Sequence, residues 1–293
     1  MVWSKNLGLM GGRSVPDVTQ LVSTTYNTGK LWLMDNLTKA FHFVDIPDNF
    51  FTTTTVLYPY EPYRTLDTPG LVGCNLWAAT TPAALQIYNA QTNTVANGPL
   101  CTCVCTDADM KRIFYGSGSN IYEYDPASGS QLVATLTHEP QFIFRTPAGE
   151  FYYISKDGPD LYKHTNGTDT KITLQGTGHP LVGAGRQLCA FHYNPSLDAF
   201  TVSEYNGYVY MVNMKNSTIT KVQELPYQIK WYGLALASDG RLAASWFYNG
   251  VNGGINSGLY ICTLDNDLNV STCTEIDSWT GANGSFGLTF FKE

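Results

Sequence analysis

The chain has 293 residues, of which 43% are hydrophobic and 14% charged, and its formal net charge is −7 at pH 7. No basic stripe is present, which argues against nucleic-acid binding, and no run of eighteen apolar residues predicts a membrane span. The charged content lies well below the usual value of about 25%, and the uncharged polar surface that results is typical of extracellular or virion proteins.

The first residues, 1–10, lack the long apolar core of a signal peptide. Export by another route, prior removal of a signal, and a cytosolic location therefore all stay open. We expect an extracellular or virion-surface location from the composition alone.

Along the chain, short apolar runs alternate with turn signals, and no helical period lies between them. One run recurs six times, at Leu31–Asp35, Leu76–Thr80, Ile113–Ser117, Phe151–Ser155, Phe200–Glu204 and Leu242–Trp246. A second run recurs in phase with it, at Phe41–Val44, Leu85–Tyr88, Ile121–Tyr124, Leu161–His164, Val209–Val212 and Leu259–Cys262. The first run starts at 31, 76, 113, 151, 200 and 242, so its steps of 45, 37, 38, 49 and 42 residues suit a four-stranded propeller blade.

The sequence thus predicts an all-β fold, a six-bladed β-propeller of four-stranded antiparallel blades in one domain, 1–293. The expected blades cover about 17–57, 70–100, 101–137, 141–175, 186–225 and 229–276. The first blade is expected to begin with the strand Thr19–Thr24, and Tyr58–Arg64 is expected to be an aromatic, Pro-rich loop. Residues 285–293 are expected to close the ring by pairing the two chain ends, because a ring of sheets otherwise exposes edges. The first blade already has a first strand in this interpretation, so the manner of closure stays open.

The last unit, Ile229–Ile276, carries the most specific motif. The turn Ser238-Asp239-Gly240-Arg241 is followed by Leu-Ala-Ala-Ser and then by a hairpin that bears Cys262 and Cys273. This pattern resembles the repeats of NHL, SMP-30/gluconolactonase and YVTN-type propellers. The resemblance implies the fold and leaves the function open, because this architecture serves binders, scaffolds and enzymes alike.

SMP-30-type lactonases are similar to one another in a metal site built from Glu, Asn and Asp near the starts of the innermost strands. The corresponding starts in this sequence offer no carboxylate, whereas a hard cation prefers several charged oxygen ligands. Asp157 and Asp160 could hold a cation on a loop, but a solvated turn fits them better. We therefore predict no metal and no cofactor.

The seven cysteines include one pair placed for a disulfide. Cys262 and Cys273 face each other across an expected hairpin, so we predict a bridge, with two buried thiols as the alternative. Cys101, Cys103 and Cys105 alternate along one strand, which predicts core positions rather than a zinc site. Five Asn-x-Ser/Thr sequons, at Asn36, Asn166, Asn216, Asn269 and Asn283, permit glycosylation without requiring it.

Loops that join one blade to the next share a face with the loops between second and third strands. On this face we expect a ligand-binding set of aromatic and polar residues: Tyr60, Tyr63, Arg64, Glu139, Tyr227, Lys230, Trp231, Trp246, Tyr248 and Trp279. Aromatic rings with a few polar groups suit a sugar face, a peptide or a polycyclic molecule. Packing between blades is the alternative role for each of these residues.

Candidate acid–base residues at this face are His138, His179 and Arg64. His42 and His192 fall within strands, where bonding in the core or between blades is expected. No Ser–His–Asp order, P-loop or HExxH motif is present.

The first functional hypothesis is therefore a non-enzymatic binding or structural propeller, exported or virion-borne, with a glycan or protein partner on its aromatic loop face. The alternative is a metal-independent hydrolase, isomerase or cyclase with a small-molecule pocket on the axis. A third interpretation is a cytosolic scaffold, which would fit free thiols at Cys262 and Cys273.

Overall fold

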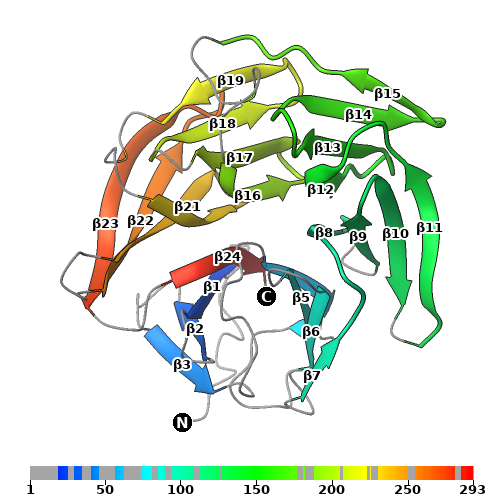
Figure 1. The fold of residues 1–293 in the computed structure, drawn as a ribbon. Helices are drawn as coiled ribbons and strands as arrows, with labels where there is room; N and C mark the ends of the chain where they lie inside the picture. The colour runs from blue at the N-terminus through cyan, green and yellow to red at the C-terminus, as the bar shows by residue number, and fades with distance from the viewer. Residues whose placement is uncertain are drawn as a thin grey trace, which may run out of the picture.

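The computed structural model describes residues 19–25, 30–34, 41–45, 57–62, 74–80, 85–89, 94–108, 112–125, 127–176, 181, 188–204, 207–222, 225, 230–249, 255–280 and 285–292. Every regular element in these ranges is a β-strand (Figure 1). The part of the chain that is described accordingly contains no helix that could cross a membrane.

The strands pair into four-stranded antiparallel sheets, six of them among the described residues. Five sheets consist of strands consecutive in the chain: β4(Leu57–Pro62), β5(Cys74–Thr80), β6(Leu85–Asn89) and β7(Thr94–Asn97); β8(Cys103–Thr106), β9(Ile113–Ser117), β10(Asn120–Asp125) and β11(Gly129–Thr135); β12(Pro140–Arg145), β13(Phe151–Ser155), β14(Leu161–Thr165) and β15(Thr168–Lys171); β16(Leu188–Asn194), β17(Ala199–Glu204), β18(Val209–Asn213) and β19(Thr218–Lys221); β20(Lys230–Leu236), β21(Arg241–Asn249), β22(Ile255–Leu264) and β23(Val270–Thr280). The sixth joins the two ends of the chain in the order β24(Ser285–Lys292), β1(Thr19–Thr25), β2(Lys30–Met34) and β3(Phe41–Asp45).

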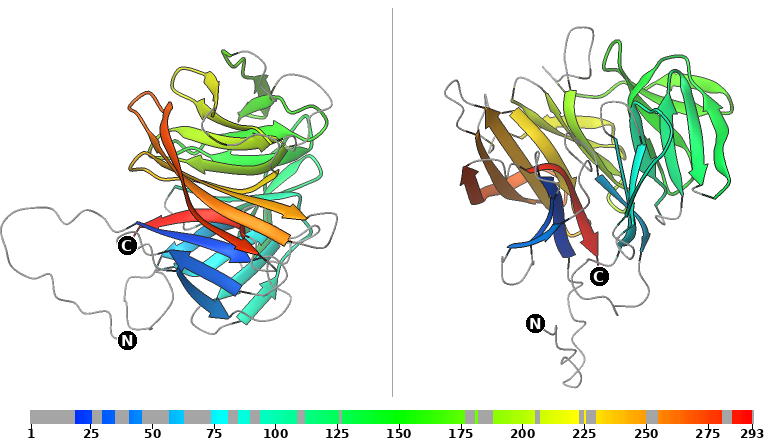
Figure 2. Two further views of the ribbon diagram at one scale, coloured as in Figure 1. Left: turned by 90° about the vertical axis from the view of Figure 1, so that its left-hand side faces the viewer. Right: turned by 60° about the horizontal axis from the view of Figure 1, so that its bottom comes forward.

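The sheets follow one another around a common centre, with the first strand of each sheet innermost (Figure 1). Neighbouring inner strands contact one another: β4 with β8, β8 with β12, β16 with β20, β20 with β24, and β24 with β4. Seen from the side, the strands run between the same two ends of the molecule (Figure 2). An all-β fold of four-stranded antiparallel sheets is consistent with a propeller-like architecture.

The pairing of the chain ends corrects one strand assignment. Thr19 lies opposite Lys292 and Val22 opposite Thr289, so β24 is the first strand of this sheet. The expectation that Thr19–Thr24 would be the first strand was wrong, because β24 occupies the inner position and moves β1 to the second.

The Pro-rich stretch Tyr58–Arg64 was expected to be a loop, and this expectation was also wrong for its first part. Leu57–Pro62 forms β4, in which Pro59 lies opposite Trp77. A proline has no backbone N–H to donate, so it disrupts a strand that has hydrogen-bonded neighbours on both sides. β4 lies at the edge of its sheet and has such a neighbour on one side only. An edge position therefore accommodates both prolines.

Aromatic side chains fill the space between the sheets β12–β15 and β16–β19. The Phe142 ring stacks on Phe191 with centroids 5.2 Å apart, and the Phe144 ring stacks on Tyr193 at 4.4 Å. The Gln141 amide donates to the carbonyl oxygen of Leu188 at 3.0 Å. Aromatic pairs bury large areas and add about 0.5–1.5 kcal/mol beyond area burial, so this seam holds the two sheets together.

Polar bonds cross the next seam, between β16 and β20. His192 Nδ1 accepts from the backbone N–H of Leu236 at 3.2 Å, and Asn194 Nδ2 donates to the carbonyl of the same residue at 2.8 Å. The prediction that His192 bonds within the core is confirmed; the side chain of His42, in β3, lies outside the described part of the structure.

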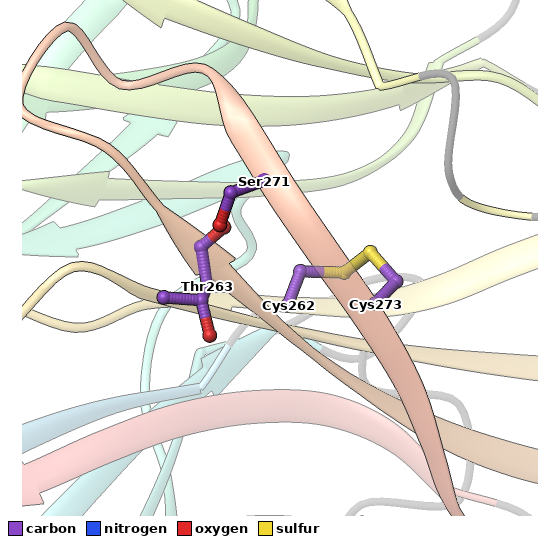
Figure 3. Close-up of a disulfide and its surroundings, with 4 residues drawn as sticks. All are labelled: Cys262, Thr263, Ser271 and Cys273. Atoms are coloured by element: carbon purple, nitrogen blue, oxygen red, sulfur yellow. A yellow bond between two sulfur atoms is a disulfide. The ribbon is translucent and has the colours of Figure 1, made fainter.

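The predicted disulfide is confirmed. Cys262 on β22 lies directly opposite Cys273 on β23, and the two are bonded (Figure 3). Close to the bridge, the Ser271 hydroxyl on β23 donates to the carbonyl oxygen of Thr263 on β22 at 3.0 Å. The bridge therefore fastens the outermost strand of its sheet.

Candidate binding face

Each sheet has two ends that differ in the connections they carry. At what we call the link end, the link from the preceding sheet meets the loop between the second and third strands. In the sheet β12–β15 these two segments are bonded, because the N–H of Lys156 donates to the carbonyl of Glu139 at 2.9 Å. At the other end, the turn end, lie the turns between first and second and between third and fourth strands.

His138 and Glu139 lie at the link end, in the connection between β11 and β12, and both are half-exposed. Glu139 Oε1 pairs with Lys156 Nζ at 2.7 Å, and the hydrogen bond to Glu139 raises the pKa of Lys156. The His138 ring packs against Tyr162 with centroids 4.9 Å apart. An imidazole, a phenol ring and an ion pair are thus presented together at the surface.

A buried network supports this surface from behind. Tyr162 stacks on Tyr153 at 5.1 Å, and the Tyr153 hydroxyl donates to Asp169 Oδ2 at 2.8 Å. The other oxygen of Asp169 lies 2.7 Å from His164 Nδ1, and the N–H of Thr137 also donates to this carboxylate. Asp169 on the outer strand β15 therefore holds the link that carries His138.

Asp169 is ionised within this network. Burial raises the pKa of its carboxyl, but the hydrogen bonds from Thr137, His164 and Tyr153 outweigh burial and bring the pKa below its usual value. The side chains of His164 and Asp169 are only 10% and 4% exposed. An imidazole–carboxylate pair of this kind can orient a base, yet here the carboxylate serves as a structural acceptor for several donors.

Trp231 is not a surface residue, so its assignment to the ligand-binding set was wrong. It is 0% exposed, and its indole N–H donates to the carbonyl of Gly207 at 3.2 Å. Its ring meets Tyr260 edge-on at 5.8 Å, and its own carbonyl accepts from the Ser203 hydroxyl at 2.9 Å. Both faces of β20 are buried, since Leu234 and Ala235 are at most 1% exposed, so the ring lies in the core.

Trp246 on β21 lies directly opposite Trp231 on β20. It is half-buried and packs against the same core. Its ring covers Gly258 on the neighbouring strand, where a Cβ atom would collide with the indole. Within the described residues its buried Nε1 has no hydrogen-bond partner. Close packing over a glycine explains why a large ring is tolerated there.

Four further members of the set are placed by backbone only. Tyr60 lies in β4 opposite Leu76, and Lys230, Tyr248 and Trp279 lie in β20, β21 and β23 opposite Phe247, Asn256 and Ser257. The remaining candidates, Tyr63, Arg64, His179 and Tyr227, lie outside the described residues. Of the candidate site residues predicted from the sequence, the structure therefore brings together His138 and Glu139.

No group of three or more His, Cys, Asp or Glu side chains in the described residues is arranged to hold a metal ion. Cys101, Cys103 and Cys105 are buried thiols. Burial raises the pKa of Cys101 and of Cys103 to about 12, and raises that of Cys105 well above its usual value. Neutral thiols in a core are poor metal ligands and poor nucleophiles.

The network of Tyr153, His164 and Asp169 was missed by the sequence analysis, although a signal was present. Asn166-Gly167 is a two-residue hairpin turn, and such a turn fixes His164 opposite Asp169. The contact from Asp169 to Thr137 crosses from β15 to the link before β12 and follows from no local pattern.

The fold and this surface define an all-β protein of four-stranded sheets with a polar, aromatic link end. The structure is similar to that of a protein of unknown function from Bacteroides caccae, with a TM-score of 0.56 and 9% sequence identity over 94% of this chain and 100% of that one. In all, 866 solved chains match, so the fold is shared too widely to indicate an activity. No family model matches the sequence, and no curated protein matches it.

Proposed function

We propose that the sheets are the blades of a closed six-bladed β-propeller of the NHL, SMP-30 and YVTN repeat type. Pairing of β24 with β1 supports closure by the two chain ends. Contacts between successive inner strands, together with the Gln141 bond from β12 to β16, support a continuous ring. In this architecture all link ends gather on one face, here called the link face, and all turn ends gather on the opposite face.

The protein so formed is a non-enzymatic binding propeller, exported or virion-borne, that presents its link face to a glycan or protein partner. The observation that carries this proposal is the half-exposed pair His138 and Glu139 held on a rigid support. Their backbone is fixed by the bonds of Thr137 and Lys156, so the pair is presented without the entropy cost of ordering a loop.

Binding rather than catalysis is favoured by the roles of the other reactive groups. His164 and Asp169 serve the support, His192 bonds across a seam, and the thiols of Cys101, Cys103 and Cys105 are buried and neutral. The enzyme alternative depends on His179 and Arg64, which lie outside the described residues, and it stays a prediction.

A carbohydrate or an uncharged polar peptide suits the chemistry of this face. An aromatic ring offers its face to the C–H groups of a sugar, while imidazole and carboxylate groups bond hydroxyls. The low charge density of the chain gives little long-range attraction, so the partner is recognised by contact.

The test is binding of the labelled full-length chain to a printed array of defined oligosaccharides and to intact cells. His138→Ala and Glu139→Gln should each weaken binding at least tenfold, and Thr220→Ala, an exposed residue on outer strand β19, should leave it unchanged. Wild-type binding by both link-face variants, with folding intact, would refute the proposed face. Turnover that is lost in His179→Ala would support the enzyme instead.

A further inference from the structure

The three described sequons occupy equivalent places in three different sheets. Asn166 lies in the turn between β14 and β15, Asn216 in the turn between β18 and β19, and Asn269 in the turn between β22 and β23. Each of these turns joins the third strand of its sheet to the fourth, and the three can be followed in Figure 1 at the ends of the labelled strands. Asn36 and Asn283 lie outside the described residues.

Contacts place these turns at the turn end of each sheet. Phe151, the first residue of β13, lies opposite His164 near the end of β14. In the next sheet the N–H of Met214 donates to the carbonyl of Asp198 at 3.0 Å. In the third, the N–H of Leu264 donates to the carbonyl of Gly240 at 2.8 Å. All three sequons therefore lie opposite the link end.

The three asparagines are exposed, and the turn that carries Asn166 is surrounded by open space. Asn166, Asn216 and Asn269 are all exposed residues. A Cβ atom built on Gly167, next to Asn166, would have no neighbour within 4 Å. Asn166 itself has a φ of 51°, a left-handed conformation that Asn adopts more readily than most residues. Asn216 Oδ1 accepts from the Thr218 hydroxyl at 2.6 Å, and Asn269 Nδ2 donates to Asp265 Oδ2 at 3.3 Å, both at the surface. A glycosylated amide keeps its oxygen and one N–H, so a sugar on these side chains is compatible with both bonds.

The Cys262–Cys273 bridge supplies a second, independent indication. Disulfides form and persist in oxidising compartments such as the endoplasmic reticulum, which is also where asparagine-linked glycans are added. The bridge joins β22 and β23, the two strands that the Asn269 turn connects. The same chain thus carries both the bond and the acceptor motif.

We propose that Asn166, Asn216 and Asn269 are N-glycosylation sites and that their glycans cover the face opposite the link face, where the turn ends gather. In the reaction, the side-chain amide nitrogen forms a bond to C1 of the first sugar of a polyprenyl-diphosphate-linked oligosaccharide. The bond between C1 and the diphosphate oxygen breaks, the polyprenyl diphosphate leaves with the electron pair, and the amide loses one proton. The location opposite the link face rests on the proposed function, because it requires the closed ring.

The test uses the full chain secreted by a eukaryotic cell, digested with a peptide N-glycosidase in ¹⁸O water, which converts each occupied Asn to labelled Asp. We expect labelled peptides at Asn166, Asn216 and Asn269. Thr168→Ala should abolish the label at Asn166 alone, and the matched control Thr168→Ser, which keeps the sequon, should retain it. This pair leaves the left-handed Asn166 in place, and Thr218→Ala with Thr218→Ser repeats the test at Asn216.

Unlabelled Asn166 and Asn216 in secreted protein with an intact disulfide would overturn the proposal. Enzymatic removal of the glycans should leave binding to the oligosaccharide array unchanged, since the partner face is opposite; a change in binding would overturn the two-face arrangement. If the array detects no binding before or after deglycosylation while the label is present, the binding function fails and the glycosylation sites stand.

Discussion

The backbone N–H of Leu236 donates to Nδ1 of His192 at 3.2 Å, so a side chain on β16 holds the neighbouring inner strand β20. Because Nδ1 accepts this bond, the ring is neutral and carries its proton on Nε2. The side chain is 7% exposed, and burial lowers the pKa of His192 to about 4. One seam between sheets therefore depends on an uncharged imidazole.

Acid should weaken this seam within a defined pH range. The folded-state pKa of about 4 lies below the unfolded value of 6.5, so the unfolded chain binds more protons between these values, and the free energy of unfolding falls as the pH drops from 6.5 to 4. The full loss is about 3 kcal/mol, since one pKa unit is worth about 1.4 kcal/mol. Urea denaturation at a series of pH values measures this loss.

The variant His192→Asn isolates the contribution of the imidazole, because the amide oxygen can accept from Leu236 and does not titrate. Its free energy of unfolding should vary less between pH 6.5 and 4 than that of the wild type. Thr220→Ala, at an exposed position on β19 that carries no titratable group, should keep the wild-type pH dependence. Parallel curves for wild type and His192→Asn would show that the imidazole is not the titrating group.

Replacing Asp169 should destabilise the support of the link. Asp169→Ala leaves the hydroxyl of the buried Tyr153 without its acceptor, and an unsatisfied buried donor costs about 1–3 kcal/mol. The N–H of Thr137 also loses its acceptor, but it lies at the surface, where water can replace the carboxylate. We therefore expect a loss of about 1–3 kcal/mol in urea denaturation. Asp157→Ala, at an exposed position in the nearby loop, should change stability by less than about 0.5 kcal/mol.

The contribution of Asp169 to the free energy of unfolding should also depend on pH, and it should decrease in acid. The folded pKa is lowered, so the stabilisation is fully present above the unfolded value of about 3.9 and is lost as the pH falls through the folded value. The stability difference between wild type and Asp169→Asn should therefore shrink below pH 4. A difference that stays constant down to pH 2 would contradict an ionised Asp169.

Removing the disulfide should cost about 2–3 kcal/mol, the chain-entropy value for a loop closed over 11 residues. The double variant Cys262→Ala, Cys273→Ala is compared with wild type by urea denaturation with and without dithiothreitol. Reductant should destabilise the wild type and leave the double variant unchanged. Two free thiols at these positions in the native protein, detected by mass spectrometry, would instead favour the cytosolic scaffold.

Local patterns were sufficient where a short turn fixed the pairing. The turn centred near Asp267 placed Cys262 opposite Cys273, and recurring apolar runs marked the second and third strands of five described sheets. In the sheet that joins the chain ends, the same runs fall on the third and fourth strands, β2 and β3. Two errors arose where a non-local partner decided the structure. The pairing of β24 with β1 made Thr19–Thr25 a second strand, and the edge position of β4 allowed prolines in a strand.

The candidate face was less predictable, because exposure depends on how neighbouring sheets pack. Trp231 lies at the start of a strand as expected, yet its ring is buried because β20 is covered on both faces. His138 lies just before the strand β12 and stays half-exposed, with its ring packed against Tyr162. The position of a residue in the sequence predicts at which end of its sheet it lies. The packing of neighbouring sheets decides whether its side chain is buried or exposed.

The thiols of Cys101, Cys103 and Cys105 should be unreactive in the folded protein. A pKa of about 12 for Cys103 leaves a thiolate fraction at pH 8 roughly a thousandfold smaller than that of an exposed cysteine, and burial also blocks access. Iodoacetamide should therefore modify the three residues together, and at the rate of global unfolding when reagent is in excess. Added Zn²⁺ should not change this rate, because one strand cannot present three alternating thiols tetrahedrally. Rapid labelling of Cys103 in native protein, or its protection by Zn²⁺, would show that this strand is an accessible or metal-binding element instead of a core strand.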